Sequence, residues 1–492
     1  MTLDALLAHS GTISPPPSAP VKGLEYDSRK VGDGSVFFAF PGGHVDGHRF
    51  VPAARAAGAV AVVSERDAPE NDEGIWVQVR HGRRALAAAA LVFYGNPDER
   101  LRLIGVTGTN GKTTTAHLAD SVLRAAGKTT GLLGTTGYQL ADRSLPSVNT
   151  TPESLDLVRM LVELEEASGT HVTLEASSHA LELGRIAGFH FDTAVFTNLS
   201  QDHLDFHGDM ESYFASKRRL FEGDGPGPRA AVINADDPYG ERLLEIDGIE
   251  KLTFSVKGTG DVRALEVEST FDGLHLLVAT PHGETEMVSQ LVGEFNVPNV
   301  LAAVGVGITQ GIDLQTIKQG IEECKAVPGR FEIIREGQTF LVAVDYAHTD
   351  DALRNLISSA KQLAPAGGRI LTVFGCGGDR DRAKRPLMGA AAGELSDRVI
   401  LTSDNPRNED TMRILADTEV GLQRVDANYS REPDRRKAIA KAFSEAGAGD
   451  IVLIAGKGHE TYQQIGDERL PFDDRETARE LLKDILHGKV AG

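Results

Sequence analysis

The sequence has little of what would place it outside a reducing, aqueous compartment. Its 492 residues include only two cysteines, Cys324 and Cys376, which cannot form a disulfide framework. No apolar run reaches the roughly 18 to 20 residues that a membrane-spanning helix needs. The first residues carry Asp4 and no basic cluster ahead of an apolar core, unlike a secretory signal. We therefore expect a soluble, cytoplasmic protein without membrane insertion.

Basic residues are in deficit. The chain has 51 lysines and arginines against 71 aspartates and glutamates, a formal net charge of -20. This excess disfavours a general binder of nucleic acid or anionic membranes, because both are polyanions. Any bound anion must therefore be held by local groups. At about 150 residues per domain, the length predicts three domains.

Apolar strand-like runs alternate with helical patterns from residue 100 onward, which predicts parallel α/β sheets. The predicted strands are 35–40 near the start, 101–106, 171–176, 194–199 and 230–234 in the middle, and 340–345, 369–374, 398–402 and 451–455 toward the end. Polar stretches near 95–100 and 328–330 separate these groups. We predict domains at 1–97, 98–329 and 330–492.

A glycine-rich stretch follows the first strand of the middle group. Residues 107–114 read Thr-Gly-Thr-Asn-Gly-Lys-Thr-Thr, which is typical of a phosphate-binding loop between a strand and a helix. In such a loop backbone N–H groups face the phosphates, Lys112 supplies a point charge and the Thr113 hydroxyl holds Mg²⁺. The usual spacing has glycine where this chain has Val106. The alternative is a glycine-rich turn with a solvated lysine.

Acidic and imidazole side chains follow two further strands. Glu175 ends one predicted strand, where a carboxylate beside a phosphate loop suits a Mg²⁺ ligand. Residues 202–207 contain two histidines and two aspartates. Because imidazole suits Mg²⁺ less well than oxygen does, this second pattern is equally compatible with a zinc or manganese site.

A set of ordered motifs extends these local patterns over almost the whole chain. They lie at 107–115, 149–152, 174–179, 198–208, 293–299, 328–332 and 345–349. Together they resemble the Mur ligases of peptidoglycan synthesis, and most closely the branch that adds the third residue of the stem peptide. The resemblance implies an α/β fold of three domains: an N-terminal α/β UDP-binding domain, a central P-loop parallel-sheet ATPase domain and a C-terminal Rossmann-like α/β domain.

The resemblance also implies the cofactors, ATP and Mg²⁺, and the residues that bind them. ATP would be bound by Gly108, Thr109, Asn110, Gly111, Lys112, Thr113, Thr114, Asn299, Arg330 and Asp345. Mg²⁺ would be held by Thr113, Glu175, His203 and Lys217, and the implied catalytic residues are Lys112, Glu175, His203 and Lys217. Lys217 matches a lysine that the family carbamylates, a change that turns a neutral amine into an anion able to ligate metal.

The implied substrates are UDP-MurNAc-L-Ala-D-Glu and meso-diaminopimelate. The first would contact Tyr26, Ser28, Gly43, His44, Val45, Asn149, Thr150, Thr151, Ser177 and Arg185. The second would contact Arg380, Asp404, Asn405, Pro406, Arg407, Gly456 and Glu460. Arg407 can grip a distal carboxylate bidentately, whereas lysine offers an ammonium there, so diaminopimelate is favoured over lysine or ornithine. The chain departs from many relatives at Leu183, where they carry glutamine, and at Asp350, where they carry proline.

The implied reaction is ATP-dependent amide ligation through an acyl phosphate on the D-glutamate carboxylate. One chain holds every expected site, so we expect a monomer, with no nucleic-acid partner. Two rivals are a folylpolyglutamate synthase, which is a related amide ligase, and a P-loop NTPase that acts as a switch. The segments 27–29 and 404–407 argue against the first. The second leaves the uridine-type N-terminal domain without a role.

Overall fold

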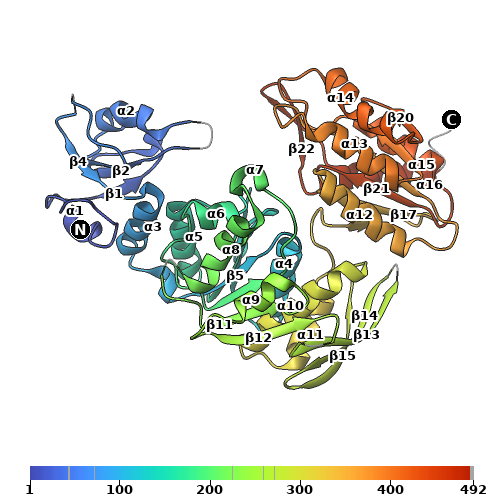
Figure 1. The fold of residues 1–492 in the computed structure, drawn as a ribbon, viewed down its shortest axis with the longest axis horizontal. Coiled ribbons are helices and arrows are strands. Elements are labelled where there is room, and N and C mark those ends of the chain that lie inside the picture. The colour runs from blue at the N-terminus through green and yellow to red at the C-terminus, as the bar shows by residue number, and fades with distance from the viewer. Residues whose placement is uncertain (43–44, 71, 224, 259, 271, 488–492) are drawn as a thin grey trace. The chain divides into compact units, whose positions relative to one another are not determined.

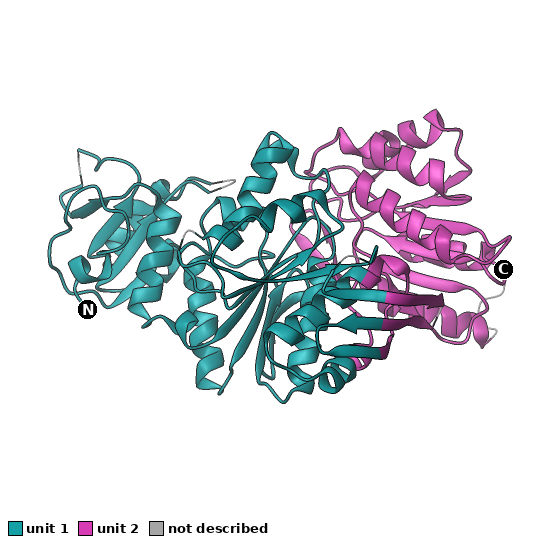
Figure 2. Ribbon diagram, turned by 60° about the horizontal axis from the view of Figure 1, so that its bottom comes forward, with its two compact units in different colours: residues 1–264, 278–285, 298–321 teal, residues 265–277, 286–297, 322–492 magenta. Residues whose placement is uncertain are grey.

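The computed structural model describes residues 1–42, 45–70, 72–223, 225–258, 260–270 and 272–487. It divides into two compact units (Figure 2). Unit 1 comprises Met1–Ala264, Val278–Thr285 and Pro298–Ile321, and unit 2 comprises Leu265–Leu277, Glu286–Val297 and Glu322–Gly492. Helices and strands alternate along the chain in both units (Figure 1). The α/β class predicted from the sequence is confirmed.

The first sheet of unit 1 has four parallel strands in the order β1-β2-β3-β4. Their bounds, with those of the accompanying helices, are β1 Gly23–Glu25, β2 Ser35–Ala39, β3 Ala61–Ser64, β4 Ile75–Gln78, α1 Leu3–Leu6, α2 Val51–Ala56, α3 Gly82–Phe93, and the 3-10 turns η1 Ser28–Lys30, η2 Gly47–Phe50 and η3 Pro97–Glu99. Phe37 packs with α2, and Phe38 packs with α1 and α3, because neighbouring side chains of a strand point to opposite faces. Strand β2 is therefore buried on both sides.

The second sheet has 11 strands in the order β15-β14-β13-β12-β11-β10-β5-β9-β6-β7-β8. Their bounds are β5 Arg102–Thr107, β6 Thr130–Gly134, β7 Gly137–Leu140, β8 Arg143–Leu145, β9 His171–Glu175, β10 Thr193–Phe196, β11 Ala230–Asn234, β12 Glu250–Ser255, β13 Val262–Thr270, β14 Gly273–Thr280 and β15 Gly283–Ser289. The strands from β12 to β6 are parallel to one another. The predicted strand at 194–199 ends earlier, at Phe196, because the following residues hydrogen-bond to the loop after β5.

The helices that accompany this sheet are α4 Lys112–Ala125, α5 Ser154–Glu166, α6 Ser178–Glu182, α7 Leu204–His207, α8 Met210–Glu222, α9 Pro238–Leu243, η4 Glu294–Asn296, α10 Val297–Thr309 and α11 Leu314–Glu323. Helix α11 packs closely on α4. A Cβ on Gly320 would lie 2.4 Å from the Val122 Cα, so only glycine permits this approach. The packing fixes α4, which begins at the end of the glycine-rich loop.

The sheet of unit 2 has the order β16-β17-β21-β18-β19-β20, with β16 antiparallel to β17 and the other pairs parallel. The elements of this region are β16 Glu332–Ile334, β17 Leu341–Asp345, α12 Asp350–Leu363, β18 Ile370–Phe374, α13 Lys384–Leu395, β19 Arg398–Leu401, α14 Thr411–Arg424, β20 Tyr429–Arg431, α15 Arg435–Glu445, β21 Ile451–Ala455, β22 Tyr462–Ile465, β23 Glu468–Pro471 and α16 Asp474–Leu486. Helices α12, α13 and α14 cover one face, and α15 and α16 cover the other. The four strands predicted here are confirmed as parallel, and their carboxyl ends point to one edge, where ligands of such sheets bind.

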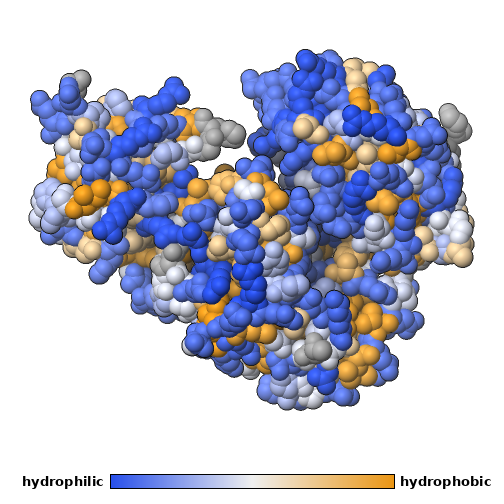
Figure 3. Space-filling model, in the orientation of Figure 1, coloured by the Kyte–Doolittle hydropathy of each residue, from blue (hydrophilic) through white to orange (hydrophobic). Residues whose placement is uncertain are grey.

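The surface is mostly hydrophilic on the face that Figure 3 shows, with apolar residues in small separate groups. This distribution agrees with a chain of net charge -20. In the part of the chain that the structure describes, no helix combines the length and the apolar character that crossing a membrane requires.

Candidate active site

The glycine-rich stretch forms a loop between β5 and α4. Gly108 and Gly111 have φ angles of +146° and +84°, which residues with a Cβ rarely adopt. A Cβ on Gly108 would lie 1.9 Å from Thr197 Oγ1, and one on Gly111 would lie 2.3 Å from Asn299 Oδ1. The two glycines are therefore required by backbone conformation and by close neighbours. A strand, a glycine loop and a helix N-terminus together form a site suited to phosphate.

The segment after β10 holds this loop in place. Asn198 accepts the Thr109 N–H at its backbone oxygen at 2.9 Å and the Asn110 N–H at its side-chain oxygen at 3.0 Å. Thr197 Oγ1 donates to the Asn110 oxygen at 2.6 Å. These bonds join the ends of two neighbouring strands and so hold the loop between them.

Glu175 lies at the end of β9, beside the loop, and its side chain is buried. Its Oε2 accepts a hydrogen bond from Thr113 Oγ1 at 3.0 Å, and its Oε1 accepts the Thr135 N–H at 2.8 Å. A Cβ on Gly134 would lie 2.2 Å from Glu175 Oε1, so the backbone of β6 also passes close to this carboxylate. The structure thus brings together the hydroxyl and the carboxylate that the sequence analysis assigned to a metal.

Two lysines of the predicted site meet at one backbone oxygen. Lys112 Nζ donates to the Gly108 oxygen at 3.0 Å, and Lys217 Nζ, on α8, donates to the same oxygen at 2.7 Å. Lys217 is 1 % exposed, and its Nζ lies 4.4 Å from the centre of the Tyr213 ring. Burial, and then the charge of Lys112, hold the pKa of Lys217 well below its ordinary range. Burial therefore favours the neutral form of this amine.

Histidines and aromatic rings surround this lysine. His203 has φ +52°, and its ring lies 4.8 Å from His179 and 6.2 Å from Tyr213, measured between centroids. Burial lowers the pKa of His203 to about 4, against the opposing charge of Asp202. Among the described residues, no three His, Cys, Asp or Glu side chains gather as a metal-holding group. A closed zinc site would need such a group.

The residues predicted to hold the sugar peptide lie next to Glu175. Thr151 Oγ1 donates to the Glu175 backbone oxygen at 2.6 Å and accepts the Ser177 N–H at 3.1 Å. Arg185 Nη1 donates to the Thr151 oxygen at 3.0 Å. Thr150 Oγ1 lies 3.2 Å from Thr135 Oγ1. Asn149 lies two residues before Thr151, in the segment between β8 and α5. These side chains and the phosphate loop thus share one edge of the sheet.

The predicted uridine residues lie in the segments that follow β1 and β2 of the first sheet of unit 1. The Tyr26 hydroxyl donates to Asp156 of α5, and its ring packs on Phe40 with centroids 6.2 Å apart. Ser28 begins η1, directly after β1. Val45 is exposed. Gly43 and His44 lie outside the described residues.

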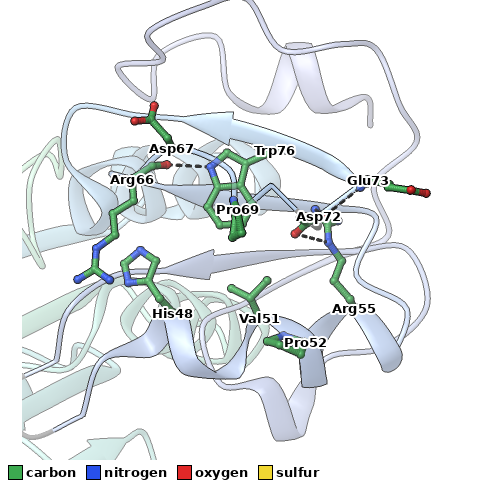
Figure 4. Close-up of a pocket in the computed structure, with 11 residues that line it drawn as sticks. His48, Val51, Pro52, Arg55, Arg66, Asp67, Pro69, Asp72, Glu73 and Trp76 are labelled. Atoms are coloured by element: carbon green, nitrogen blue, oxygen red, sulfur yellow. Dashed lines mark hydrogen bonds and ion pairs between the residues drawn. The ribbon is translucent and has the colours of Figure 1, made fainter.

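A pocket of about 580 Å³ opens beside the same sheet (Figure 4). It is lined by His48, Val51, Pro52, Arg55, Arg66, Asp67, Pro69, Asp72, Glu73, Gly74 and Trp76. Several of its polar groups bind one another: Trp76 Nε1 donates to the Arg66 oxygen at 2.8 Å, and Arg55 lies 3.0 Å from Asp72. Of the predicted site residues that the structure describes, none lines it.

The remaining ATP residues are divided between the units. Asn299 belongs to unit 1, where its Oδ1 accepts a hydrogen bond from Thr115 Oγ1 at 3.3 Å. Arg330 and Asp345 belong to unit 2. There Asp345 Oδ2 accepts the Phe331 N–H at 2.8 Å, so the carboxylate lies beside the chain that carries Arg330. Burial raises the pKa of Asp345.

The predicted amino-acid residues gather at the carboxyl edge of the sheet of unit 2. Asn405 Nδ2 donates to Glu460 Oε2 at 2.8 Å, and a Cβ on Gly456 would lie 2.7 Å from Asp404 Oδ2. Pro406 is buried in the same turn. Arg380 and Arg407 both lie beside Gly377, where a Cβ would meet Arg407 Nη1 at 3.0 Å and Arg380 Cγ at 3.7 Å. The structure therefore assembles residues from three separate loops.

Two buried cations of this region were missed by the sequence analysis. Lys457 Nζ donates to Asn405 Oδ1 and to Glu460 Oε2, both at 3.1 Å, so it joins two predicted ligand groups. Arg385 pairs with Glu409 and Asp417 directly behind Gly377. Lys457 lies between Gly456 and Glu460, two residues assigned to the site from the sequence, and could have been recognised from that position. Arg385 is one of several arginines in a polar segment, and no local pattern distinguishes it.

The fold and this site define an α/β enzyme with a phosphate-binding loop, a buried carboxylate beside that loop, and a second, ion-rich site at the edge of another parallel sheet. Three family models match the chain: "Mur ligase family, catalytic domain" at 20–94, "Mur ligase middle domain" at 106–307 and "Mur ligase, glutamate ligase domain" at 329–458. They follow one another without overlap.

Similar proteins extend this match to the full length. A UDP-N-acetylmuramoyl-L-alanyl-D-glutamate–2,6-diaminopimelate ligase of Solibacter usitatus (strain Ellin6076) is 56% identical over 95% of this chain and 96% of its own length. A ligase of the same name from Geobacillus thermodenitrificans (strain NG80-2) is 48% identical over 94% of each. A solved structure with that name is 36% identical, with a TM-score of 0.69, and covers 99% of this chain and 100% of its own. The chain belongs to the Mur ligase family and is an ATP-dependent ligase.

Proposed function

We propose that the protein joins meso-diaminopimelate to UDP-MurNAc-L-Ala-D-Glu in peptidoglycan precursor synthesis. The observation that carries the proposal is the phosphate loop, with Lys112 and Lys217 on one carbonyl oxygen and Thr113 bonded to Glu175. The names of the full-length relatives support the choice of substrates.

The reaction has two steps with balanced bonds. A carboxylate oxygen of D-glutamate attacks the γ-phosphorus of ATP, the bond to the β-phosphate oxygen breaks, and ADP leaves. The amine of diaminopimelate then attacks the acyl carbon, phosphate leaves, and the amine loses a proton as the amide forms. Positioning and charge neutralisation by the loop N–H groups and Lys112 supply most of the catalysis in such transfers.

We assign the metal to Thr113 and Glu175, with His203 and Lys217 completing the set. The hydroxyl and carboxylate oxygens at 3.0 Å are the ligands that Mg²⁺ prefers, so this part of the site fits the ion. Bound Mg²⁺ would neutralise charge on the transferred phosphoryl group. Lys217 can join the set only after CO₂ adds to its amine. Its buried position, with no carboxylate within ion-pair distance among the described residues, supports that modification.

The incoming amino acid is assigned to Arg380, Arg407, Asp404, Asn405 and Glu460. The arginines suit carboxylates, and the acidic and amide oxygens suit ammonium groups. Because meso-diaminopimelate carries both groups at its distal end, it can satisfy this set more fully than lysine or ornithine can. Pro406 and Gly456 shape the backbone around these side chains.

A single assay tests the proposal against its rivals. Purified protein is incubated with ATP, Mg²⁺, UDP-MurNAc-L-Ala-D-Glu and each of diaminopimelate, lysine and ornithine, and ADP and amide product are measured by mass spectrometry. We expect ADP and amide in equal amounts, with diaminopimelate used most efficiently. ADP formation without either substrate would indicate an NTPase switch. A parallel reaction with ATP, Mg²⁺, glutamate and a folate covers the remaining alternative. Ligation in that reaction, with none to the sugar peptide, would indicate a folylpolyglutamate synthase.

We further propose domain boundaries at 97/98 and 329/330, a monomeric enzyme and a cytoplasmic location. The monomer is supported by the presence of all assigned sites in one chain. The location is supported by the two cysteines, which are too few for the disulfide framework of an oxidising compartment. Size-exclusion chromatography with light scattering tests the first point, and a mass of two chains would contradict it.

A further inference from the structure

Four arginines surround the loop between β18 and α13, and they differ in their partners. Arg385 is 1 % exposed and donates Nη2 to Glu409 at 2.7 Å and Nη1 to Asp417 at 2.9 Å. Arg382 is exposed and donates to Asp417 at 3.0 Å. In the part of the chain that the structure describes, no carboxylate lies within ion-pair distance of Arg380 or Arg407. Two arginines are therefore neutralised by the fold, and two are open to a ligand.

The paired and open arginines meet at Gly377. Arg385 Nη2 donates to the Gly377 oxygen at 3.2 Å, while Arg407 Nη1 lies 3.0 Å from the Cβ position of the same residue. Arg407 Nη1 also donates to the Gly378 oxygen at 2.7 Å. The guanidinium that binds two carboxylates and one that binds no described carboxylate therefore lie at the same residue.

Glu409 also fixes the backbone of both loops. Its Oε1 accepts the Asp379 N–H at 2.6 Å, and the neighbouring Asn408 Nδ2 donates to Asp379 Oδ2 at 2.8 Å. Asp379 and Arg407 have φ angles of +52° and +51°, a left-handed backbone conformation that residues other than glycine rarely adopt. Such conformations persist only where the surroundings determine them. The ion pair therefore stabilises the conformation of the loops that carry Arg380 and Arg407.

We infer that Arg385 is a positioning residue for selection of the incoming amino acid, acting by holding Glu409 and Asp417 away from Arg380 and Arg407. The inference rests on the proposed function, because it concerns the site assigned to diaminopimelate. With Arg385 present, the two open arginines meet the substrate carboxylate. Without it, Glu409 competes with that carboxylate and attracts an ammonium group instead. Loss of Arg385 should therefore weaken diaminopimelate and favour lysine.

The test compares kcat/KM for meso-diaminopimelate and L-lysine in the full chain, with ATP and UDP-MurNAc-L-Ala-D-Glu present. The variants are Arg385→Gln, the double variant Arg385→Gln with Glu409→Gln, and Arg382→Gln as the matched control. We expect Arg385→Gln to raise the KM for diaminopimelate about tenfold and to lower the diaminopimelate-to-lysine ratio by a similar factor. The KM for ATP should stay unchanged. The double variant should recover most of the ratio, because it leaves no unpaired carboxylate, and Arg382→Gln should match the unmodified enzyme.

The outcomes are distinguishable from failure of the proposed function. Unmodified enzyme that makes no amide overturns the proposed function and the inference with it. Ligation by the unmodified enzyme, together with an unchanged substrate ratio in folded Arg385→Gln, overturns the inference alone. An equal fall of the diaminopimelate-to-lysine ratio of kcat/KM in the single and double variants would also overturn it, since this result would show a purely structural role for Arg385. If Arg385→Gln fails to fold, Arg385→Lys replaces it, and a ratio like that of the unmodified enzyme would contradict the inference, because lysine cannot hold two carboxylates in a fork.

Discussion

Buried basic side chains have different partners in the two units. In unit 1, Lys217 donates to a backbone oxygen, with no carboxylate within ion-pair distance among the described residues. In unit 2, Arg435 is as deeply buried but forms two hydrogen bonds to Asp474, each 2.7 Å long. An isolated buried charge is costly, whereas a paired and hydrogen-bonded one is tolerated. The comparison separates a buried amine suited to react from a buried cation that holds the fold together.

The largest expected effect concerns the unpaired lysine. Lys217→Ala should lower the rate of amide formation by about a thousandfold, because a proposed ligand of the metal that would neutralise the transferred phosphoryl group is lost. The rate is measured by ADP release and product mass. Lys128→Ala, at an exposed position just after α4, is the matched control and should retain full activity. A rate of amide formation by Lys217→Ala within tenfold of that of the unmodified enzyme would contradict a functional role for the buried lysine.

The paired arginine should affect stability instead. Arg435→Met should reduce the free energy of unfolding by about 3 to 5 kcal/mol, because Asp474 would remain buried without its partner. Arg436→Met, which breaks an exposed pair with Glu480, should have no measurable effect. Urea unfolding followed by circular dichroism compares them. Combining Arg435→Met with Asp474→Leu should restore most of the lost free energy of unfolding. If it does not, the hydrogen-bond geometry of Arg435 contributes more to stability than the neutralisation of Asp474 does.

Acid should remove the stability contributions of a buried histidine and of an ion-paired glutamate in different pH ranges. Burial, aided by Arg102 and Lys128 and opposed by Asp192, lowers the pKa of His171 to about 4. As the pH falls, His171 is therefore protonated in the unfolded chain before it is protonated in the folded chain. The His171 contribution to stability, on the order of 2 kcal/mol, is complete above the ordinary histidine pKa and is lost as the pH falls toward 4. His171→Gln should flatten that part of the stability curve.

Glu409 should act at lower pH. Its hydrogen bonds to Arg385 lower the pKa of Glu409 to about 2, so its contribution is complete above the ordinary glutamate pKa and is lost as the pH falls through 2. The stability of Glu409→Gln should therefore depend less on pH below 4.5 than that of the unmodified chain. If Glu409→Gln and His171→Gln changed the free energy of unfolding over the same pH range, the distinction between a buried group and an ion-paired group would be contradicted.

The smallest effect tests the spacing of the arginines. Gly377→Ala places a Cβ 3.0 Å from Arg407 Nη1, so this guanidinium must shift by a few tenths of an ångström. We expect the KM for the amino acid to rise about fivefold, in line with the sensitivity of oriented sites to small displacements. Gly447→Ala is the control, because its Cβ would meet only Asp450 Oδ2 at an ordinary 3.7 Å. Steady-state kinetics at saturating ATP measures both, and equal KM values would show that the arginine tolerates the shift.

The sequence predicted those features that depend on contiguous residues. The loop at 107–114 was recognisable because φ angles of +146° and +84° demand glycine at fixed spacing, and the buried strands were recognisable from their apolar runs. The last residues of the predicted strand at 194–199 do not pair within the sheet but hydrogen-bond to the phosphate loop. This contact joins segments that are distant in the sequence, and no local pattern encodes it. The partners of Arg385 lie 24 and 32 residues away on another helix and its preceding loop. Pairing of that kind is decided by the fold, so composition alone could not separate Arg385 from Arg380.

The position of Trp76 has an experimental consequence. It is the single tryptophan of the chain and lies on β4, in the first sheet of unit 1, beside a pocket that none of the described site residues lines. Indole emission from the native protein therefore reports on one fluorophore at one known place. A change in that emission on titration with the uridine substrate would therefore place binding near the first sheet of unit 1, whereas a signal for the amino-acid substrate would first require a tryptophan to be introduced into unit 2.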